Sequence, residues 1–252
     1  YLPTLKTVPK ILILLIIITL SAWGYMIYQH WQMTALPMSE MWMPPNSTEQ
    51  WQVSDFMIVY VMWAVMMAAM MLPSALAMIK AYSKACQQRY GSDTPYTYLF
   101  SLAYLLVWFS FSIALTLLQW QLHGLNWLSA MMENSNTLLA AGIFIVAGIY
   151  QFTALKNACL RHCRLPISFL LNSWKNGKSG AFNMGLIYGN TCLGCCWAQM
   201  MLMFAVGVMN LTAMILITVF ILLEKSLPDN KDYISKAAGV LFCFWGARLL
   251  FL

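Results

Sequence analysis

The chain has 252 residues, of which 61% are hydrophobic and 9% are charged, whereas a soluble domain carries about 25% charged residues. This composition excludes an ordinary soluble protein and predicts an all-α, polytopic transmembrane helical bundle, with one transmembrane domain over residues 1–252 and the lipid bilayer around it. The formal charge of +6 indicates no nucleic-acid partner, because positive charge in a membrane protein belongs first to its cytoplasmic loops.

Hydropathy along the chain predicts seven helices. They cover residues 10–28, 54–79, 96–120, 137–155, 180–206, 211–224 and 234–252. The sixth is short for a membrane span, so a count of six helices is the alternative. The first run is flanked by lysines, as a signal peptide would be, but no small-residue cleavage site follows it, so we expect an anchor that is retained. Because the chain begins at Tyr1, the presence of a preceding leader stays open.

Lysine and arginine sort to one side of these helices. If the N-terminus is cytoplasmic, every Lys and Arg except Arg248 falls in a cytoplasmic segment. Cytoplasmic loops of membrane proteins carry such an excess of positive charge. The pattern predicts a multi-pass membrane protein with a cytoplasmic N-terminus. Seven cysteines in these surroundings, without the spacing of secreted domains, are expected to stay reduced.

The first outer loop, residues 30–53, is predicted to be rich in thioethers. It holds four closely spaced methionines beside His30, namely Met33, Met38, Met41 and Met43. Thioethers bind Cu(I) without losing a proton and do not oxidise to disulfides, so they suit an external, oxidising compartment. Two interpretations stay open: a loop that collects copper, and an interfacial loop whose Met and Trp side chains dip into the bilayer surface.

The second predicted helix carries a row of methionines. Met62, Met66 and Met70 lie four residues apart on one face, and Met67, Met71 and Met78 lie on or near the neighbouring face. These methionines lie at the membrane depth expected for the cysteines of the fifth predicted helix, so we expect the two sulfur-rich stripes to meet. Pro73 is expected to kink or open the helix and to free a main-chain carbonyl. Methionine is also a common core filler, so plain packing stays an alternative.

The fourth predicted helix runs into Cys159, His162 and Cys163 before Pro166 ends it. On a continuing helix the two cysteines share a face, and His162 would add a third donor to a metal site at the cytoplasmic surface. A fourth donor is absent from the nearby sequence. A reactive or idle pair of thiols is therefore the alternative.

The fifth predicted helix contains the densest sulfur stretch, residues 188–203. Cys192, Cys196, Met200 and Met203 fall on one helical stripe, with Cys195 at its edge. Packing alone has no reason to prefer sulfur, whereas a soft cation such as Cu(I) prefers thiolate and thioether donors. The alternative is again packing, because free Cys behaves as a small hydrophobe. Gly185 and Gly189 predict a close contact between this helix and another.

Three segments carry a family resemblance. They are W-A-V-M-M-A-A-M-M-L-P-S from Trp63, Y-Q-F-T-A-L-K-x-x-C-L-R-H-C-R from Tyr150, and G-N-T-C-L-G-C-C-W-A-Q-M-M-L-M-F from Gly189. Together they resemble a bacterial family of predicted metal-binding integral membrane proteins, also described as copper chaperones, over about residues 55–230. The resemblance implies a multi-pass helical protein of the bacterial inner membrane that binds metal. As donors it implies Met66, Met67, Met70, Met71, Cys159, Cys163, Cys192, Cys195, Cys196 and Met200. Asn190 stands where the family usually has glycine, which bears on local backbone geometry more than on the donors.

These observations predict a membrane protein that binds Cu(I) and stores it or delivers it to a membrane cuproenzyme. The outer methionines would capture the ion, and the methionines and cysteines of the second and fifth helices would hold it before transfer to the cuproenzyme or to Cys159 and Cys163. Thiolates also bind Zn(II), but the abundance of methionine favours copper over zinc. The sequence has no Gly-rich phosphate loop, so we expect no ATP-driven pump.

A different class of function stays open: an accessory structural subunit of a larger membrane enzyme complex, in which the methionines pack against partner helices and bind no metal. Thiol-redox catalysis is disfavoured, because the adjacent Cys195 and Cys196 would form a strained disulfide and lie at lipid depth. The acidic residues form no paired carboxylates or hydrolase triad. We therefore expect a protein that is not an enzyme.

Overall fold

The structure is a computed structural model that describes residues 10–35, 44–45, 50–91, 94–129, 132, 134–227 and 233–251. Over these residues the chain is all-α, and the only β-pairing is an isolated bridge between Leu128 and Asn134. The helices are α1 (Lys10–Ala35), α2 (Val53–Tyr90), α3 (Thr94–Gly124), α4 (Thr137–Tyr150), α5 (Ala154–Arg164), α6 (Pro166–Ser173), α7 (Gly177–Val206), α8 (Leu211–Ser226) and α9 (Tyr233–Leu250). The predicted all-α class is confirmed for these residues.

Each of the seven predicted segments lies on a helix, but the fourth is interrupted. α4 ends at Tyr150, and α5 starts after a short break at an angle of 66° to it. Thr153 causes the restart: its hydroxyl donates to the carbonyl of Tyr150 and accepts from the backbone N–H of Lys156, which caps the new helix. Pro166 then begins α6, because proline suits the first turn of a helix.

Four of the described helices, α1, α2, α3 and α7, are long and apolar enough to cross a membrane, and the bent pair α4 and α5 makes a fifth if it is counted as one span. The composition and these helices agree with a membrane protein. The described structure does not confirm seven spans, and the sidedness of the chain stays a prediction.

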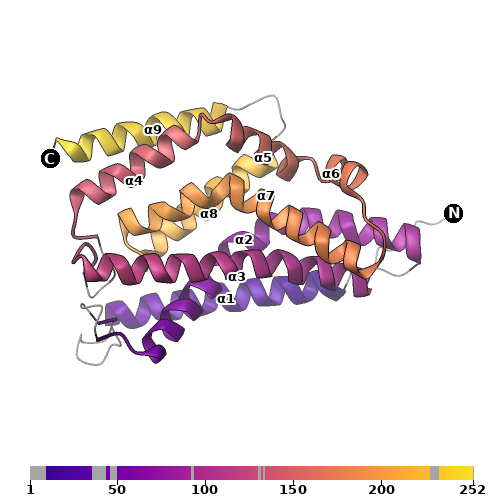
Figure 1. The fold of residues 1–252 in the computed structure, drawn as a ribbon, viewed down its shortest axis with the longest axis horizontal. Coiled ribbons are helices and arrows are strands. Elements are labelled where there is room, and N and C mark those ends of the chain that lie inside the picture. The colour runs from indigo at the N-terminus through magenta and orange to yellow at the C-terminus, as the bar shows by residue number, and fades with distance from the viewer. Residues whose placement is uncertain are drawn as a thin grey trace.

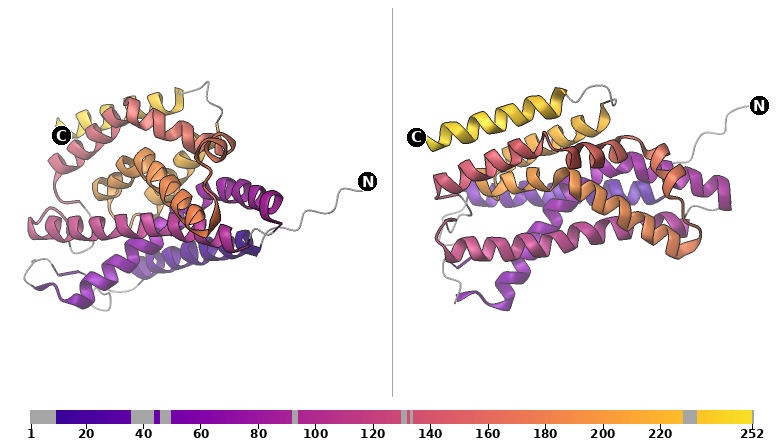
Figure 2. Two further views of the ribbon diagram at one scale, coloured as in Figure 1. Left: turned by 45° about the vertical axis from the view of Figure 1, so that its right-hand side comes forward. Right: turned by 45° about the horizontal axis from the view of Figure 1, so that its top comes forward.

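The helices pack as two neighbouring groups joined by α7 (Figure 1). α2 packs on both α1 and α3, and α3 runs along α7. α4 and α9 lie side by side on the opposite flank, as both views in Figure 2 also show. α7 contacts α3, α4, α5 and α8, so it is the helix on which the bundle converges.

Glycine allows the close approach of α7 to α3. A Cβ atom added at Gly185 would collide with the carbonyl oxygen of Phe100, and one added at Gly189 would come within 2.8 Å of Val107 Cγ2. Only residues without a Cβ fit this backbone contact. The close contact predicted from the spacing of these two glycines is therefore confirmed.

Pro73 lies inside α2 and leaves a carbonyl without its helical partner. Because proline has no N–H, the carbonyl of Ala69, four residues earlier, loses its intrahelical hydrogen bond. The indole N–H of Trp23 on α1 donates to that oxygen at 2.9 Å. The freed carbonyl predicted from the sequence thus becomes an attachment point for α1.

Replacing Trp23 with phenylalanine is expected to lower the free energy of unfolding by about 1–3 kcal/mol, because the Ala69 carbonyl would be left in the core without a donor. Denaturant unfolding of the purified full chain in detergent measures this loss. The matched control is Trp31→Phe, since the Trp31 side chain is 58% exposed. Equal stability of the two variants would contradict the role assigned to Trp23.

Candidate functional site

Four thiols from two helices meet in the core: Cys163 of α5 and Cys192, Cys195 and Cys196 of α7. The Sγ atoms of Cys163 and Cys195 are 3.8 Å apart, and those of Cys195 and Cys196 are 3.2 Å apart. Cys192 adjoins them, because the thiol of Cys195 donates to the carbonyl oxygen of Cys192 at 3.1 Å. All four side chains are buried and none is in a disulfide. We call these four residues the thiol cluster.

The bend before α5 brings Cys163 to α7. α5 buries the face that carries Lys156, Leu160 and Cys163, and this face packs on α7. The sequence predicted that Cys163 would act with Cys159 and His162 at a surface. The structure instead places Cys163 beside Cys195, which a continuous helix after α4 would not predict.

Cys159 and His162 are not part of the thiol cluster. Cys159 is half-buried, and its sulfur faces Gly194, 2.9 Å from the position that a Cβ atom on this glycine would take. His162 is exposed, and its Nδ1 lies 2.9 Å from the carbonyl oxygen of Ala158. The structure therefore does not gather Cys159, His162 and Cys163 into one donor set.

The predicted methionine donors lie in the same buried core as the thiols. Met66, Met67, Met70, Met71 and Met200 are all at most 1% exposed. Tyr104 of α3 links the two sulfur-rich helices, because its hydroxyl donates to the carbonyl of Met71 at 3.2 Å and lies 3.4 Å from the sulfur of Cys192. The methionine row thus borders the thiol cluster through this tyrosine.

The outer methionine loop lies largely outside the described residues, because Met38, Met41 and Met43 are not among them. Met33 and His30 are half-buried near the end of α1. The interpretation of this loop as a copper collector stays a prediction.

A lysine adjoins the thiol cluster. The Nζ of Lys225 on α8 donates to the sulfur of Cys192 at 2.9 Å and to the hydroxyl of Ser74 on α2 at 2.9 Å. An ammonium group beside a thiol stabilises the thiolate, which is the form that binds metal. Sequence reasoning placed Lys225 in a cytoplasmic segment, and only its position at the end of an apolar helix hinted at a buried contact.

The residue before it, Glu224, belongs to a separate polar network. Both carboxylate oxygens accept from the Nζ of Lys156, at 2.7 Å and 3.0 Å. The amide of Gln199 and the hydroxyl of Ser235 also donate to the carboxylate, at 2.8 Å and 2.7 Å. Lys156 is fully buried and also donates to the side-chain oxygen of Gln151. Buried ions persist only when they are paired and hydrogen-bonded in this way, and the sequence had suggested instead that Lys156 was a loop charge.

The thiol cluster supplies donors but not a preformed cage. Within the described ranges, no three His, Cys, Asp or Glu side chains are arranged to hold a metal ion. The sulfurs of Cys163 and Cys195 are 3.8 Å apart. Two metal–sulfur bonds of about 2.3 Å span about 3.8 Å at a tetrahedral angle and about 4.6 Å in a linear arrangement. An increase of under about 1 Å, within reach of a side-chain rotation, would therefore admit a metal held linearly between the two sulfurs.

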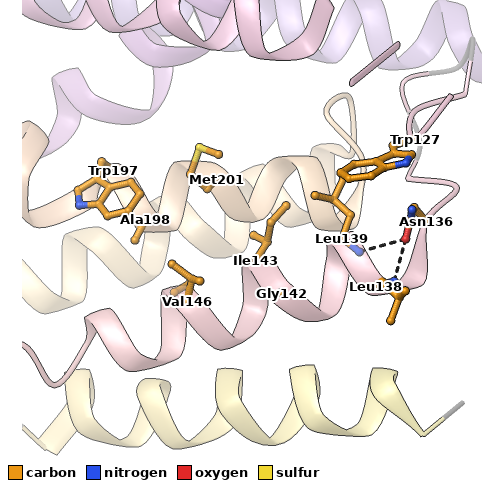
Figure 3. A pocket seen from close by; sticks show the side chains of 11 residues that line it. Trp127, Asn136, Leu138, Leu139, Gly142, Ile143, Val146, Trp197, Ala198 and Met201 are labelled. Carbon is orange, nitrogen blue, oxygen red and sulfur yellow. Dashed lines mark hydrogen bonds between the residues drawn. The ribbon is translucent and has the colours of Figure 1, made fainter. Parts of the chain in front are cut away.

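An apolar cavity of about 520 Å³ lies between α4 and α7 and does not include any thiol (Figure 3). Trp127 and Trp197 lie toward its opposite ends. Its lining is Trp127, Asn136, Leu138, Leu139, Gly142, Ile143, Val146, Ala147, Trp197, Ala198 and Met201. The side-chain oxygen of Asn136 caps α4 by accepting from the backbone N–H groups of Leu138 and Leu139, so this oxygen is already occupied.

Comparison with known proteins supports a copper-related role. No curated protein and no solved structure matches the chain. A family model, PpoB2, described as a copper chaperone, matches residues 60–249. The matched range contains the methionine row, the thiol cluster, and the residues that contact Glu224 and Lys225. The match confirms the family resemblance that the sequence motifs carry. The chain therefore belongs to the PpoB2 family of copper chaperones.

Proposed function

We propose that this protein is a copper chaperone of the bacterial inner membrane that holds Cu(I) at the thiol cluster and delivers it to a membrane cuproenzyme. The observation that carries the proposal is the contact of four buried thiols from α5 and α7 in a chain of a copper chaperone family. Thiolates are the preferred donors of Cu(I), and burial shields them from other metals and from oxidants.

The cluster suits transfer as well as storage. Its donors come from two helices, α5 and α7, so a movement of α5 changes the number of sulfurs around the ion. The thioethers of Met66, Met67, Met70, Met71 and Met200 are weaker, neutral donors in the same core. We assign them to the route by which copper reaches or leaves the thiols, with Tyr104 at the junction between Met71 and Cys192.

The proposal is tested by the metal content of the purified chain under reducing, anaerobic conditions. Wild type is expected to hold near-stoichiometric copper, and a variant with serine at Cys163, Cys192, Cys195 and Cys196 is expected to lose it. The matched control is Cys243→Ser, because the Cys243 thiol of α9 packs toward Gly148 of α4, away from the thiol cluster. Mass spectrometry of the metal in each preparation gives the readout.

A second candidate function is an accessory structural subunit of a larger membrane complex. The absence of a preformed ligand set among the described residues favours it, since packed thiols alone satisfy the structure. This alternative predicts equal, negligible copper in wild type and in the four-serine variant, together with co-purification of a partner complex. That outcome would overturn the copper proposal.

A further inference from the structure

The two charged residues at the end of α8 have different electrostatic partners. Glu224 is neutralised by Lys156, in the only salt bridge among the described residues. Its neighbour Lys225 turns to Ser74 and Cys192 instead. In the described part of the chain, the ammonium of half-buried Lys225 thus has the buried sulfur of Cys192 beside it, where a carboxylate would be the ordinary partner.

Lys225 is half-buried, and an ammonium that is partly withdrawn from water is stabilised by a negative charge beside it. The atoms that reach Lys225 Nζ are a neutral hydroxyl and the sulfur of Cys192. The contact therefore favours one negative charge, located on Cys192 or on a complex that contains it. This preference follows from the 2.9 Å contact and from the full burial of the Cys192 side chain.

Charge balance then selects among metal complexes. Two thiolates on Cu(I) carry one net negative charge, which the single ammonium of Lys225 cancels. Four thiolates on Zn(II) carry two negative charges and would leave one of them uncompensated in the core. Two thiolates on Zn(II) are neutral and would leave the ammonium without a counter-charge. Three thiolates on Zn(II) also carry one negative charge, but no three Cys, His, Asp or Glu side chains in the described ranges are arranged to hold a metal ion. A monovalent soft cation between two sulfurs is therefore the combination that suits both the cluster and its lysine.

We infer that Lys225 is a fixed counter-charge that makes the thiol cluster select a two-thiolate complex of Cu(I), with Cys192 as one of the two ligands. The inference rests on the proposed function and adds to it the charge and the coordination number of the bound species. Lys225 acts as a positioning residue, because it touches the ligand Cys192 and not the metal.

The test compares Lys225→Met with Lys225→Arg in the purified full chain under anaerobic, reducing conditions. Competition with a chromogenic Cu(I) chelator is expected to show an affinity loss of more than about tenfold for Lys225→Met, as for losing a hydrogen bond to a charged group. Lys225→Arg keeps the charge and is expected to stay within about tenfold of wild type. Lys178→Met is the matched control, because Lys178 is exposed.

Two further measurements separate electrostatics from folding. X-ray absorption of copper-loaded wild type is expected to show two sulfur neighbours around the copper. This measurement uses wild type alone, so it does not depend on the folding of a variant. The preference for Cu(I) over Zn(II), measured by competition, is expected to fall in Lys225→Met, since a neutral two-thiolate zinc complex no longer faces an uncompensated ammonium.

The outcomes are distinguishable. If wild type binds copper but has three or four sulfur neighbours, or if Lys225→Met keeps wild-type affinity and metal preference, the counter-charge inference is wrong while the copper function stands. If wild type binds no copper, the proposed function fails and the inference fails with it.

Discussion

Replacing Glu224 with leucine is expected to lower the free energy of unfolding by about 3–5 kcal/mol. The change removes the carboxylate from a fully buried Lys156 and leaves an ammonium unpaired in the core. It also takes the acceptor from Gln199 and Ser235. Because α5, α7, α8 and α9 all contribute to this network, the loss should be seen as cooperative unfolding of that side of the bundle.

The measurement is denaturant unfolding of the purified chain in detergent, arranged as a double-mutant cycle. Glu224→Leu combined with Lys156→Met is expected to recover most of the loss, since an apolar pair of similar volume replaces the buried ions. Ser235→Ala serves as the milder comparison, with a cost of about 1 kcal/mol for one hydrogen bond. If Glu224→Leu unfolds at the same denaturant concentration as wild type, the stabilising role assigned to the Glu224 network is wrong.

Replacing Gly185 with valine is expected to cost about 3 kcal/mol or more and to reduce the yield of folded protein. The first added atom would meet the main-chain oxygen of Phe100 and would lie 2.8 Å from Ala103 Cβ. A backbone oxygen cannot rotate away as a side chain can, so α3 and α7 would have to separate. That separation would disturb Tyr104, which joins α3 to the thiol cluster.

The control for this prediction is Gly142→Ala in α4. Gly142 lies in a helix, and a Cβ atom there would meet nothing within 4 Å. Alanine is the better helix former by about 1 kcal/mol, so this variant is expected to be at least as stable as wild type. Size-exclusion profiles and unfolding midpoints of the two variants provide the comparison. Similar behaviour of the two would show that the α3–α7 contact tolerates a side chain.

Hydropathy located the helices because apolar runs of this length are typical of membrane-spanning helices. It missed the break at Thr153, because a long averaging window cannot see one hydroxyl that caps a new helix. The α7 cysteines were recognisable by their spacing within one helix. The approach of Cys163 was not, because it depends on the 66° turn between α4 and α5.

Charges were the other limit of sequence reasoning. Lys156 and Glu224 are separated by 68 positions, and a count of positive residues per loop assigns the lysine to solvent without reference to its partner. Lys225 was likewise assigned by its place in the chain. The feature that could have corrected the placement of Lys156 was the rarity of acids: a glutamate at the end of an apolar helix needs a nearby cation when the surroundings are lipid.

The order of synthesis gives the Lys156–Glu224 pair a further consequence. Lys156 leaves the ribosome 68 residues before the glutamate that neutralises it, and an unpaired lysine does not settle in an apolar interior. α5 therefore docks only after α8 has been made, and Cys163 on the same helix reaches the α7 thiols only at that stage. A nascent or truncated chain that lacks α8 would hold its cysteines apart, so copper would be captured only by a completed protein.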